Sequence, residues 1–383
     1  MITCIRGKNI LKNGAFSEGC VFIDNGKIIS EADVGAKEYR EYDFGEDYVI
    51  PGLIDLHTHG AVGVDYGGAS CEEILKAISF QRSHGATSVM PTVTSSTFEK
   101  TCAALENIRE AMKDESIGCS IIGAHLEGPY FSEKQSGAQE KSMLGNPKPE
   151  HYKYIVENFG DIIKRWDYAP ELDINGEFCE YLKAHNIIPS AAHTDAKYSD
   201  MCLAREKGCN LVTHLYSCTS TITREMGFRV LGVIECAYLW DDMYIEIIAD
   251  GKHLPIELLR LIFKLKPHDK IILVSDSLKV AGSTERYSNV GNMPCIIEDG
   301  VCKLLDRSAF AGSIATADVL IKKAVEAGLD LSEAVKMGSE NPAYLFGLSK
   351  GKLDVGYDGD ITVLDKDLNV KKVFVKGEII NDN

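Results

Sequence analysis

The chain has 383 residues, of which 45% are hydrophobic, so it is long enough for one large domain with a smaller unit attached, or for two domains. That hydrophobic content excludes a disordered chain, and the net charge of −16 argues against nucleic acid as a partner, because an acidic surface repels phosphate backbones. A small anionic substrate remains compatible with this charge, since a local basic pocket is enough to bind it.

Cysteine usage and the N-terminal residues indicate the compartment. The 12 cysteines are scattered and include no Cys-x-x-Cys pair, which is typical of free thiols in a reducing environment. The first residues lack the charged and apolar regions of a signal peptide, and no apolar run is long enough to span a membrane. We therefore expect a cytoplasmic protein without a membrane partner.

The two ends of the chain have the same character. Residues 1–50 alternate short apolar runs with glycine turns, and Asp24-Asn25-Gly26-Lys27 is a hairpin signal. Residues 349–383 contain two further apolar runs, Asp360–Asp365 and Val370–Val375. Neither end has enough strands for a stable sheet. We predict that both together form one small β-sandwich domain, into which residues 51–348 are inserted.

The middle of the chain alternates strand and helix patterns. Eight candidate strands are Leu53–His57, Ser88–Thr94, Cys119–His125, Ile162–Tyr168, Ile187–Ala192, Leu211–His214, Tyr244–Ala249 and Lys270–Ser275. Candidate helices between them include Glu72–His84, Thr97–Lys113, Glu177–His185, Ala196–Lys207 and Pro255–Lys264. This alternation predicts a TIM-type (β/α)8 barrel in an α/β fold, with a doubly wound open sheet as the alternative. A hairpin formed by Pro294–Ile297 and Val301–Leu305 follows the eighth strand.

Metal-ligand side chains stand at the ends of these strands. His57 and His59 are two residues apart on the first strand and can point the same way. Glu127, His193 and His214 follow the third, fifth and sixth strands, and Asp276 follows the eighth. A single histidine at a strand end is more often structural. Five ligand-type residues on one face are harder to explain by packing, because buried polar groups need partners.

The pattern therefore predicts a divalent metal site, most simply for zinc. Glu127, His193 and His214 would hold one ion and leave a fourth position open. His57 and His59 would hold a second ion, with Glu127 as a bridge. Asp276 suits a general base that later acts as a general acid, although it could also be a strand-end cap.

Several motifs in order along the chain carry a resemblance. They are Pro-Gly-Leu-Ile-Asp-Leu-His-Thr-His-Gly, His-Leu-Glu-Gly-Pro-Tyr, Ala-Ala-His-Thr at His193, Thr-His-Leu-Tyr at His214, Val-Ser-Asp-Ser at Asp276, and Ala-Gly-Ser at Ala311 and Gly312. The chain resembles the amidohydrolase superfamily, and within it the N-acetylglucosamine-6-phosphate deacetylases. The resemblance implies the barrel with a two-ended β-sandwich, and release of acetate from N-acetylglucosamine 6-phosphate to give glucosamine 6-phosphate. Because some members lack His-x-His and bind one ion, this chain resembles the two-metal members.

The resemblance also implies the substrate contacts. They are Ala138, Gln139, Ser217, Cys218, Arg224, His253, Ala311 and Gly312. Arg224 and His253 would bind the phosphate, although Arg224 could equally form a solvated or interfacial salt bridge. In this family the loop that carries Arg224 can reach the site of a neighbouring subunit, which implies a homodimer.

Two departures from the family pattern keep other substrates open. Ser217-Cys218-Thr219 stands where the family usually has Asn-Ala-Met, and Gln139 stands where it usually has histidine. Alternative substrates are N-acetylgalactosamine 6-phosphate and an N-acyl amino acid. A catalytically silent scaffold is a remote alternative, because such proteins usually lose metal ligands.

Overall fold

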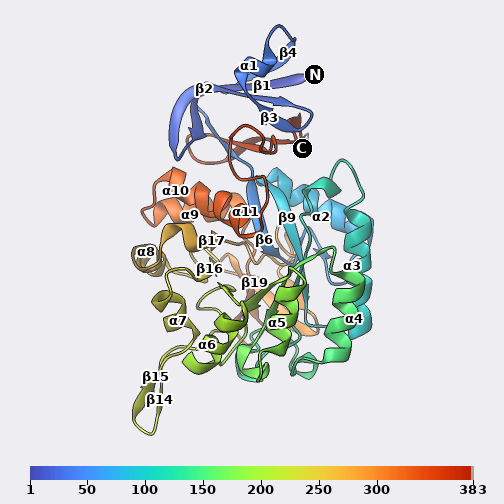
Figure 1. Cartoon of the computed structure of the whole chain (residues 1–383), viewed down its shortest axis with the longest axis vertical. Helices are drawn as coiled ribbons and strands as arrows, with labels where there is room; N and C mark the ends of the chain where they lie inside the picture. Colours follow the sequence, from blue (N-terminus) through green and yellow to red (C-terminus); the bar gives the residue numbers. More distant parts are fainter. Residues whose placement is uncertain (381–383) are drawn as a thin grey trace.

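The computed structural model describes residues 1–380 and contains two units (Figure 1). A sheet unit at the top of the view carries both ends of the chain, and a barrel surrounded by helices lies below it. No helix within residues 1–380 is both long and apolar enough to cross a membrane.

Segments from both termini form the upper sheet. Its strands are β1 (Ile2–Lys12), β2 (Ala15–Asp24), β3 (Lys27–Ile29), β4 (Tyr39–Asp43), β5 (Tyr48–Pro51), β22 (Ile361–Leu364), β23 (Val370–Val375) and β24 (Glu378–Ile379). Strand β22 pairs antiparallel with β5, which joins the C-terminal strands to the N-terminal ones. The predicted turn between β2 and β3 is present, with φ of 49° at Asn25 and 77° at Gly26, as a tight hairpin requires. The domain boundaries at residues 50 and 348 stay a prediction.

Eight parallel strands form the barrel. They are β6 (Leu53–Thr58), β9 (Ala86–Thr94), β10 (Ala124–Glu127), β11 (Ile163–Tyr168), β12 (Ile188–Ala191), β13 (Leu211–Val212), β16 (Tyr244–Ile247) and β17 (Ile271–Leu273). They pair in chain order from β6 to β17. A parallel bridge between Thr58 and Ser277 then links the first strand to the segment after the last. The barrel prediction is confirmed, and the doubly wound alternative is wrong because the sheet returns to its first strand.

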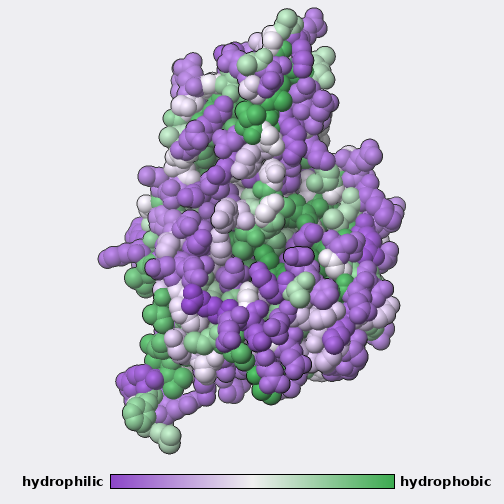
Figure 2. Space-filling view, in the orientation of Figure 1, coloured by the Kyte–Doolittle hydropathy of each residue, from purple (hydrophilic) through white to green (hydrophobic). Residues whose placement is uncertain are grey.

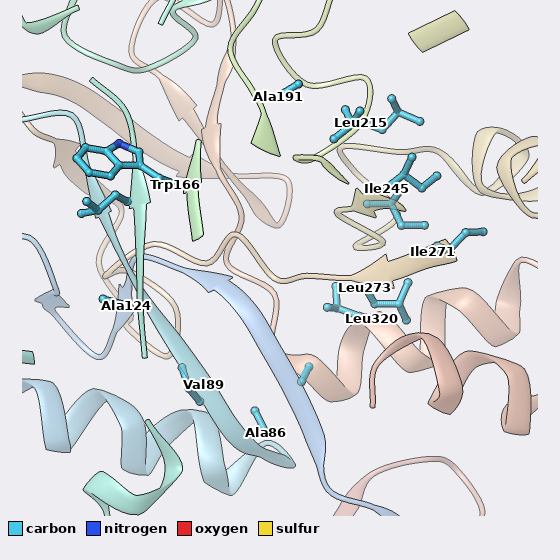
Figure 3. Close-up of a cluster of buried hydrophobic side chains, with 14 of the residues drawn as sticks. Ala86, Val89, Ala124, Trp166, Ala191, Leu215, Ile245, Ile271, Leu273 and Leu320 are labelled. Carbon is cyan, nitrogen blue, oxygen red and sulfur yellow. The ribbon is translucent and has the colours of Figure 1, made fainter. Parts of the chain in front are cut away.

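Helices surround the barrel and cover its outer face (Figure 1). They are α2 (Cys71–Ser83), α3 (Phe98–Ala111), α4 (Pro149–Phe159), α5 (Glu177–Ala184), α6 (Tyr198–Lys207), α7 (Val233–Leu239), α8 (Ile256–Leu265), α9 (Ala317–Glu326), α10 (Leu331–Met337) and α11 (Glu340–Leu345). Their apolar faces and the strands share one large buried cluster, part of which Figure 3 shows, with side chains such as Val89, Ile245 and Leu273. This packing fixes where each barrel strand ends, and therefore where its polar residues lie.

The third barrel strand begins later than predicted. Residues Gly118–Ser120 form a short 3-10 turn, and β10 starts only at Ala124. Gly123 has a φ of +135° and so interrupts the extended run, and a Cβ at this position would collide with Lys164 Cγ and lie 2.7 Å from the backbone oxygen of Ile162. The shorter strand still carries His125 and Glu127 to the barrel rim.

Two insertions leave the barrel. After β17, the strands β18 (Tyr287–Val290), β19 (Met293–Glu298), β20 (Val301–Leu304) and β21 (Phe310–Gly312) form an antiparallel sheet, which confirms the predicted hairpin. After β13, the hairpin of β14 (Thr223–Glu225) and β15 (Phe228–Val230) projects from the lower left of the molecule (Figure 1).

Candidate metal centre and substrate pocket

The C-terminal ends of five barrel strands supply the site. His57 lies on β6, with His59 just after it, and Glu127 is the last residue of β10. The remaining three residues lie two or three residues beyond their strands and are His193 after β12, His214 after β13 and Asp276 after β17. Because the strands are parallel, all these positions lie at the same rim of the barrel.

Three of these residues have strained backbones. The φ angles are 43° at His193, 29° at His214 and 48° at Asp276, in the left-handed region that non-glycine residues rarely adopt. Each such residue costs about 1–3 kcal/mol and persists only where the surrounding structure holds it. Backbone strain at three strand ends that converge on one point is typical of a functional site.

Glu127 is the centre of the first group. Its Oε1 lies 3.1 Å from His193 Nε2 and 3.2 Å from His214 Nε2, and all three side chains are buried. His193 Nδ1 lies 2.9 Å from the backbone oxygen of Gln135, which orients the ring. The Nε2 atom of His193, on the opposite side of the ring from this backbone contact, therefore faces the carboxylate of Glu127.

The second group consists of His57, His59 and Asp276. His59 Nε2 lies 3.0 Å from Asp276 Oδ1 and 3.3 Å from His57 Nε2. Glu127 joins the two groups, because its Oε1 lies 3.6 Å from His57 Nε2 and its Oε2 lies 3.6 Å from His59 Nε2. The structure thus brings together all six residues predicted for metal binding and catalysis.

These separations fit divalent ions. Ligands bound tetrahedrally at about 2.0–2.1 Å stand roughly 3.3 Å apart, close to the separations within each group. Two ring nitrogens that face each other at 3.3 Å, as in His57 and His59, repel unless a proton or a cation lies between them. Imidazole and carboxylate are also the ligands that divalent ions of this class prefer. The two groups are therefore suited to hold one ion each, with Glu127 reaching both.

The electrostatics of the site favour charged carboxylates. Burial would raise the pKa of Glu127, but His193 and His214 beside it hold that pKa well below its usual range. Burial acts in the same direction on Asp276, yet the electrostatic interaction with His57 and the hydrogen bond from His59 lower the pKa of Asp276 to about 2. Both carboxylates are therefore available as ligands or proton acceptors at neutral pH.

A cavity of about 280 Å³ opens directly above these groups. Most of the predicted substrate contacts line it, namely Ala138, Gln139, Ser217, Cys218, His253, Ala311 and Gly312. His253 is oriented by Asp250, whose Oδ2 lies 2.7 Å from its Nδ1. The cavity walls also include Tyr216, Val290 and Phe310, which the sequence did not single out. Phe310 could have been suspected only from its place beside Ala311.

Gln139 has a defined role in this geometry. Its Nε2 donates to Glu127 Oε2 over 2.7 Å, and its Oε1 accepts from the backbone nitrogen of Ser95 over 3.2 Å. These two bonds fix the orientation of the amide, because only the NH2 group can donate to a carboxylate. Gln139 therefore positions Glu127 and also lines the cavity.

Arg224 lies outside this cavity. It is on β14 of the projecting hairpin and is exposed, opposite Arg229 on β15. The structure of one chain therefore does not bring Arg224 to the site of that chain. Its predicted contact with phosphate requires a second subunit.

The sequence interpretation missed a group of charged residues inside the barrel. Arg165 and Asp167 on β11 and Glu246 on β16 are fully buried and in contact with one another. Their alternation with apolar neighbours, as in Arg165-Trp166-Asp167, is the only sequence signal that they share one face of a strand.

Comparison with known proteins places the chain in a family. Residues 48–380 match the amidohydrolase family. The chain is 30% identical to N-acetylglucosamine-6-phosphate deacetylase of Bacillus subtilis, over 97% of this chain and 94% of that protein. It is 28% identical to the human enzyme of the same name, over 98% of this chain and 93% of that protein.

Solved structures agree with this relationship. N-acetylglucosamine-6-phosphate deacetylase from Thermotoga maritima superposes with a TM-score of 0.87 at 28% identity, and covers 100% of both chains. The enzyme of the same name from Pasteurella multocida superposes with a TM-score of 0.91 at 26% identity, also over 100% of both chains. The chain belongs to the amidohydrolase family, and within it to the N-acetylglucosamine-6-phosphate deacetylases.

Proposed function

We propose that this chain hydrolyses the N-acetyl amide of N-acetylglucosamine 6-phosphate, and so releases acetate and glucosamine 6-phosphate. The observation that carries the proposal is the position of Glu127, which lies between His193 and His214 on one side and His57 and His59 on the other, at the floor of a cavity. The relatives that match over nearly the whole chain bear the name of this activity.

We assign the metal ligands as His57, His59, Glu127, His193 and His214, and the metal as zinc with up to two ions per chain. A divalent ion held there would polarise the acetyl carbonyl and acidify a water molecule. The nitrogen and oxygen ligand set suits zinc, although it also accepts other first-row ions.

Asp276 is the proposed general base and acid. Its Oδ1 lies 3.0 Å from His59 Nε2, and the side chain borders the cavity. It takes the proton of the attacking water and then delivers it to the nitrogen of the departing amine. Gln139 holds Glu127 in place while this happens, through its hydrogen bond of 2.7 Å.

The phosphate needs a local positive patch, because the chain carries a net charge of −16. His253 lines the cavity, and we propose that Arg224 of a second subunit completes the phosphate site. The projecting hairpin supports a homodimer, since Met226 and Phe228 at its tip are 96% and 75% exposed. Figure 2 shows further hydrophobic residues along the lower left edge, beside this hairpin. Exposed apolar side chains gathered in this way are typical of an interaction surface.

Arg224 can be tested against its neighbour Arg229, which lies directly opposite it on the same hairpin. We expect Arg224→Ala to raise KM for the phosphorylated sugar about 10- to 100-fold, because a hydrogen bond to a charged group contributes about 1.5–3 kcal/mol. Arg229→Ala should leave KM nearly unchanged. Equal losses on phosphorylated and unphosphorylated sugars would show that Arg224 acts on the structure and not on the phosphate.

The cysteines and the phosphorylated substrate support a proposal for the cellular location. All 12 cysteines are unpaired, which is compatible with a reducing compartment. We propose a cytoplasmic enzyme of amino-sugar catabolism that acts on a phosphorylated sugar already inside the cell.

A second candidate is deacetylation of another N-acyl substrate, such as N-acetylgalactosamine 6-phosphate or an N-acyl amino acid. Gln139, Ser217 and Cys218 favour it, since all three line the cavity where the family usually has other residues. An acetate-release assay over these compounds, with and without the 6-phosphate, separates the candidates. We expect the highest kcat/KM for N-acetylglucosamine 6-phosphate. A preference for any other compound would overturn that substrate assignment.

A further inference from the structure

A second cluster of charged side chains lies behind the metal centre, inside the barrel. Arg165 Nη1 contacts Glu246 Oε1, and Arg165 Nη2 lies 3.1 Å from Glu246 Oε2. The same guanidinium donates to Asp167 Oδ1 over 3.0 Å, and all three side chains are completely buried. Glu246 is therefore held by a two-point contact with a permanent cation, so it is an ionised carboxylate that can only accept hydrogen bonds.

His57 lies between this cluster and the cavity. Its Nε2 faces the metal centre, at 3.3 Å from His59 Nε2 and 3.5 Å from Asp276 Oδ1. Its Nδ1 faces the opposite way and lies 3.5 Å from Glu246 Oε2. This approach is longer than a hydrogen bond of good geometry, and within residues 1–380 the nitrogen has no hydrogen-bond partner, so Glu246 is the carboxylate that its ring proton faces. A negatively charged acceptor on this side of the ring favours a proton on Nδ1.

The other histidines of the centre have different surroundings. His193 Nδ1 meets a backbone oxygen, and the Nδ1 atoms of His59 and His214, like that of His57, have no hydrogen-bond partner within the described part of the chain. Of these Nδ1 atoms, that of His57 has a carboxylate oxygen 3.5 Å away. His57 is therefore distinguished by a carboxylate behind its ring. An acceptor-only group at Nδ1 keeps the proton on that nitrogen and leaves the lone pair of Nε2 free for an ion.

A second histidine, His125, packs against the ring of His57. His125 packs edge to face against His57, with ring centroids 4.6 Å apart and an interplanar angle of 82°. His125 is itself held between Thr92, with 3.0 Å from Oγ1 to Nδ1, and Asp167, with 3.0 Å from Oδ2 to Nε2. Arg165 therefore organises both neighbours of His57, because it binds Glu246 directly and reaches His125 through Asp167.

This cluster is not suited to hold an ion itself. His57, His125 and Asp167 lie close enough together to resemble a metal site. However, Asp167 is already paired with Arg165, so a divalent cation there would stand beside a guanidinium of the same sign. The cluster therefore acts as a support.

We propose that Glu246, held by Arg165, is a positioning residue that fixes the tautomer and orientation of His57 and thereby determines binding of the second metal ion. The proposal rests on the proposed metal-dependent function. The ion at Glu127, His193 and His214 does not depend on this support. The ring nitrogens of His193 and His214 make their hydrogen bonds to Glu127 and to the backbone oxygen of Gln135, and not to Glu246.

The test is the metal content of Glu246→Gln. Arg165 can only donate, so it will bind the amide oxygen of Gln and turn the NH2 group toward His57. A donor opposite Nδ1 favours the His57 tautomer that carries its proton on Nε2, and a protonated Nε2 cannot bind an ion. We expect the dissociation constant of the second ion to rise about 10- to 100-fold, so that zinc content under limiting metal falls from two ions to one. Two ions at wild-type affinity in this variant would overturn the proposal.

Asp173→Asn is the matched control. Asp173 is a buried carboxylate that caps α5 by accepting from the backbone nitrogens of Phe178 and Cys179, away from the cavity. This variant should keep two ions. An equal loss of the second ion in Asp173→Asn would show that general loosening is the cause, and would also overturn the proposal.

The wild-type protein offers a test that does not depend on the folding of a variant. In protein labelled with nitrogen-15 at histidine and stripped of metal by a chelator, NMR should report the Nδ1–H tautomer for His57, with assignment by its loss in His57→Gln. An Nε2–H tautomer would contradict the proposal, as would a wild-type protein that binds a single ion. Neither result would affect the proposed deacetylation, which is measured by acetate release from the intact enzyme.

Discussion

Two clusters of buried charged residues lie next to each other in this barrel, and they differ in how their charges are balanced. In the inner cluster, Asp167 and Glu246 are both paired with Arg165. In the outer cluster, Glu127 and Asp276 meet only histidine rings and the glutamine amide of Gln139, and they border a cavity. Both clusters draw their charged and polar side chains from several strands of the barrel.

The balance of charge distinguishes the metal centre from the supporting cluster in this barrel. A fully buried carboxylate that is paired with a guanidinium is already neutralised, and a second cation there would be repelled by the first. A carboxylate that meets only imidazoles at the edge of a cavity retains the capacity to bind a cation, because the imidazoles can give up their protons and bind a divalent ion with it. Substitutions in the outer cluster should therefore reduce metal binding and turnover, whereas substitutions of Arg165 should first reduce stability.

Glu127→Gln should have the largest effect. It keeps the shape of the side chain but removes the charge that both ligand groups share. We expect metal content to fall at both positions and acetate release to fall below detection. Elemental analysis and an acetate assay on the same sample check this, with Glu133→Gln on an exposed turn as the control. Normal turnover in Glu127→Gln would show that the outer cluster is not the metal centre.

Asp276→Asn should lower kcat by about 10²- to 10⁴-fold, the usual contribution of general acid–base catalysis. Its Oδ1 lies 3.5 Å from His57 Nε2 and 3.0 Å from His59 Nε2, so an amide of the same shape should still fit. The ion at Glu127, His193 and His214 should remain. Turnover close to that of the wild type would mean that another group takes the proton.

Arg165→Met should act on stability. It leaves Asp167 and Glu246 buried without a cation, and loss of one partner of a buried ion pair costs about 3–5 kcal/mol. Urea unfolding at saturating zinc measures the change. Arg109→Met is the control, because Arg109 pairs with the exposed carboxylates of Glu106 and Asp161, and such pairs contribute about 0–1 kcal/mol. Equal changes for both variants would contradict the assignment of Arg165 as the central buried cation.

Gln139→Ala should have the smallest effect of this series. It removes the hydrogen bond of 2.7 Å to Glu127 but none of the ligands. We expect kcat/KM to fall about 10-fold, near the lower end of what a hydrogen bond to a charged group contributes, about 1.5 kcal/mol. Gln139→Glu should reduce kcat/KM further, because it places a second carboxylate against Glu127. An unchanged kcat/KM in Gln139→Ala would show that Glu127 needs no such support.

Much of the outer cluster could be predicted from the sequence, because local patterns carry it. His57 and His59 are two residues apart on an apolar strand, and His193, His214 and Asp276 each directly follow one. A barrel brings such strand ends together whatever the details of packing. The eight-strand alternation was enough to predict that barrel, and the hairpin signals at Asn25-Gly26 predicted the pairing of β2 with β3.

The inner cluster could not be predicted in the same way. Charged residues usually lie at the surface, and only the register of neighbouring strands brings Arg165 of β11 to Glu246 of β16 across the barrel interior. The position of Arg224 relative to the site could not be predicted either, for a different reason. The hairpin that carries it leaves the barrel, so its distance from the site depends on assembly and not on local sequence.

The most direct test of the account is metal removal and restoration in the wild-type protein. Acetate release from N-acetylglucosamine 6-phosphate is measured on the purified chain, again after exhaustive chelation with the residual metal content determined, and again after zinc is returned. We predict that activity disappears with the metal and returns in proportion to zinc bound, up to two ions per chain. Undiminished acetate release from protein shown to contain no metal would contradict the account, and so would a zinc-loaded protein that releases no acetate from this sugar.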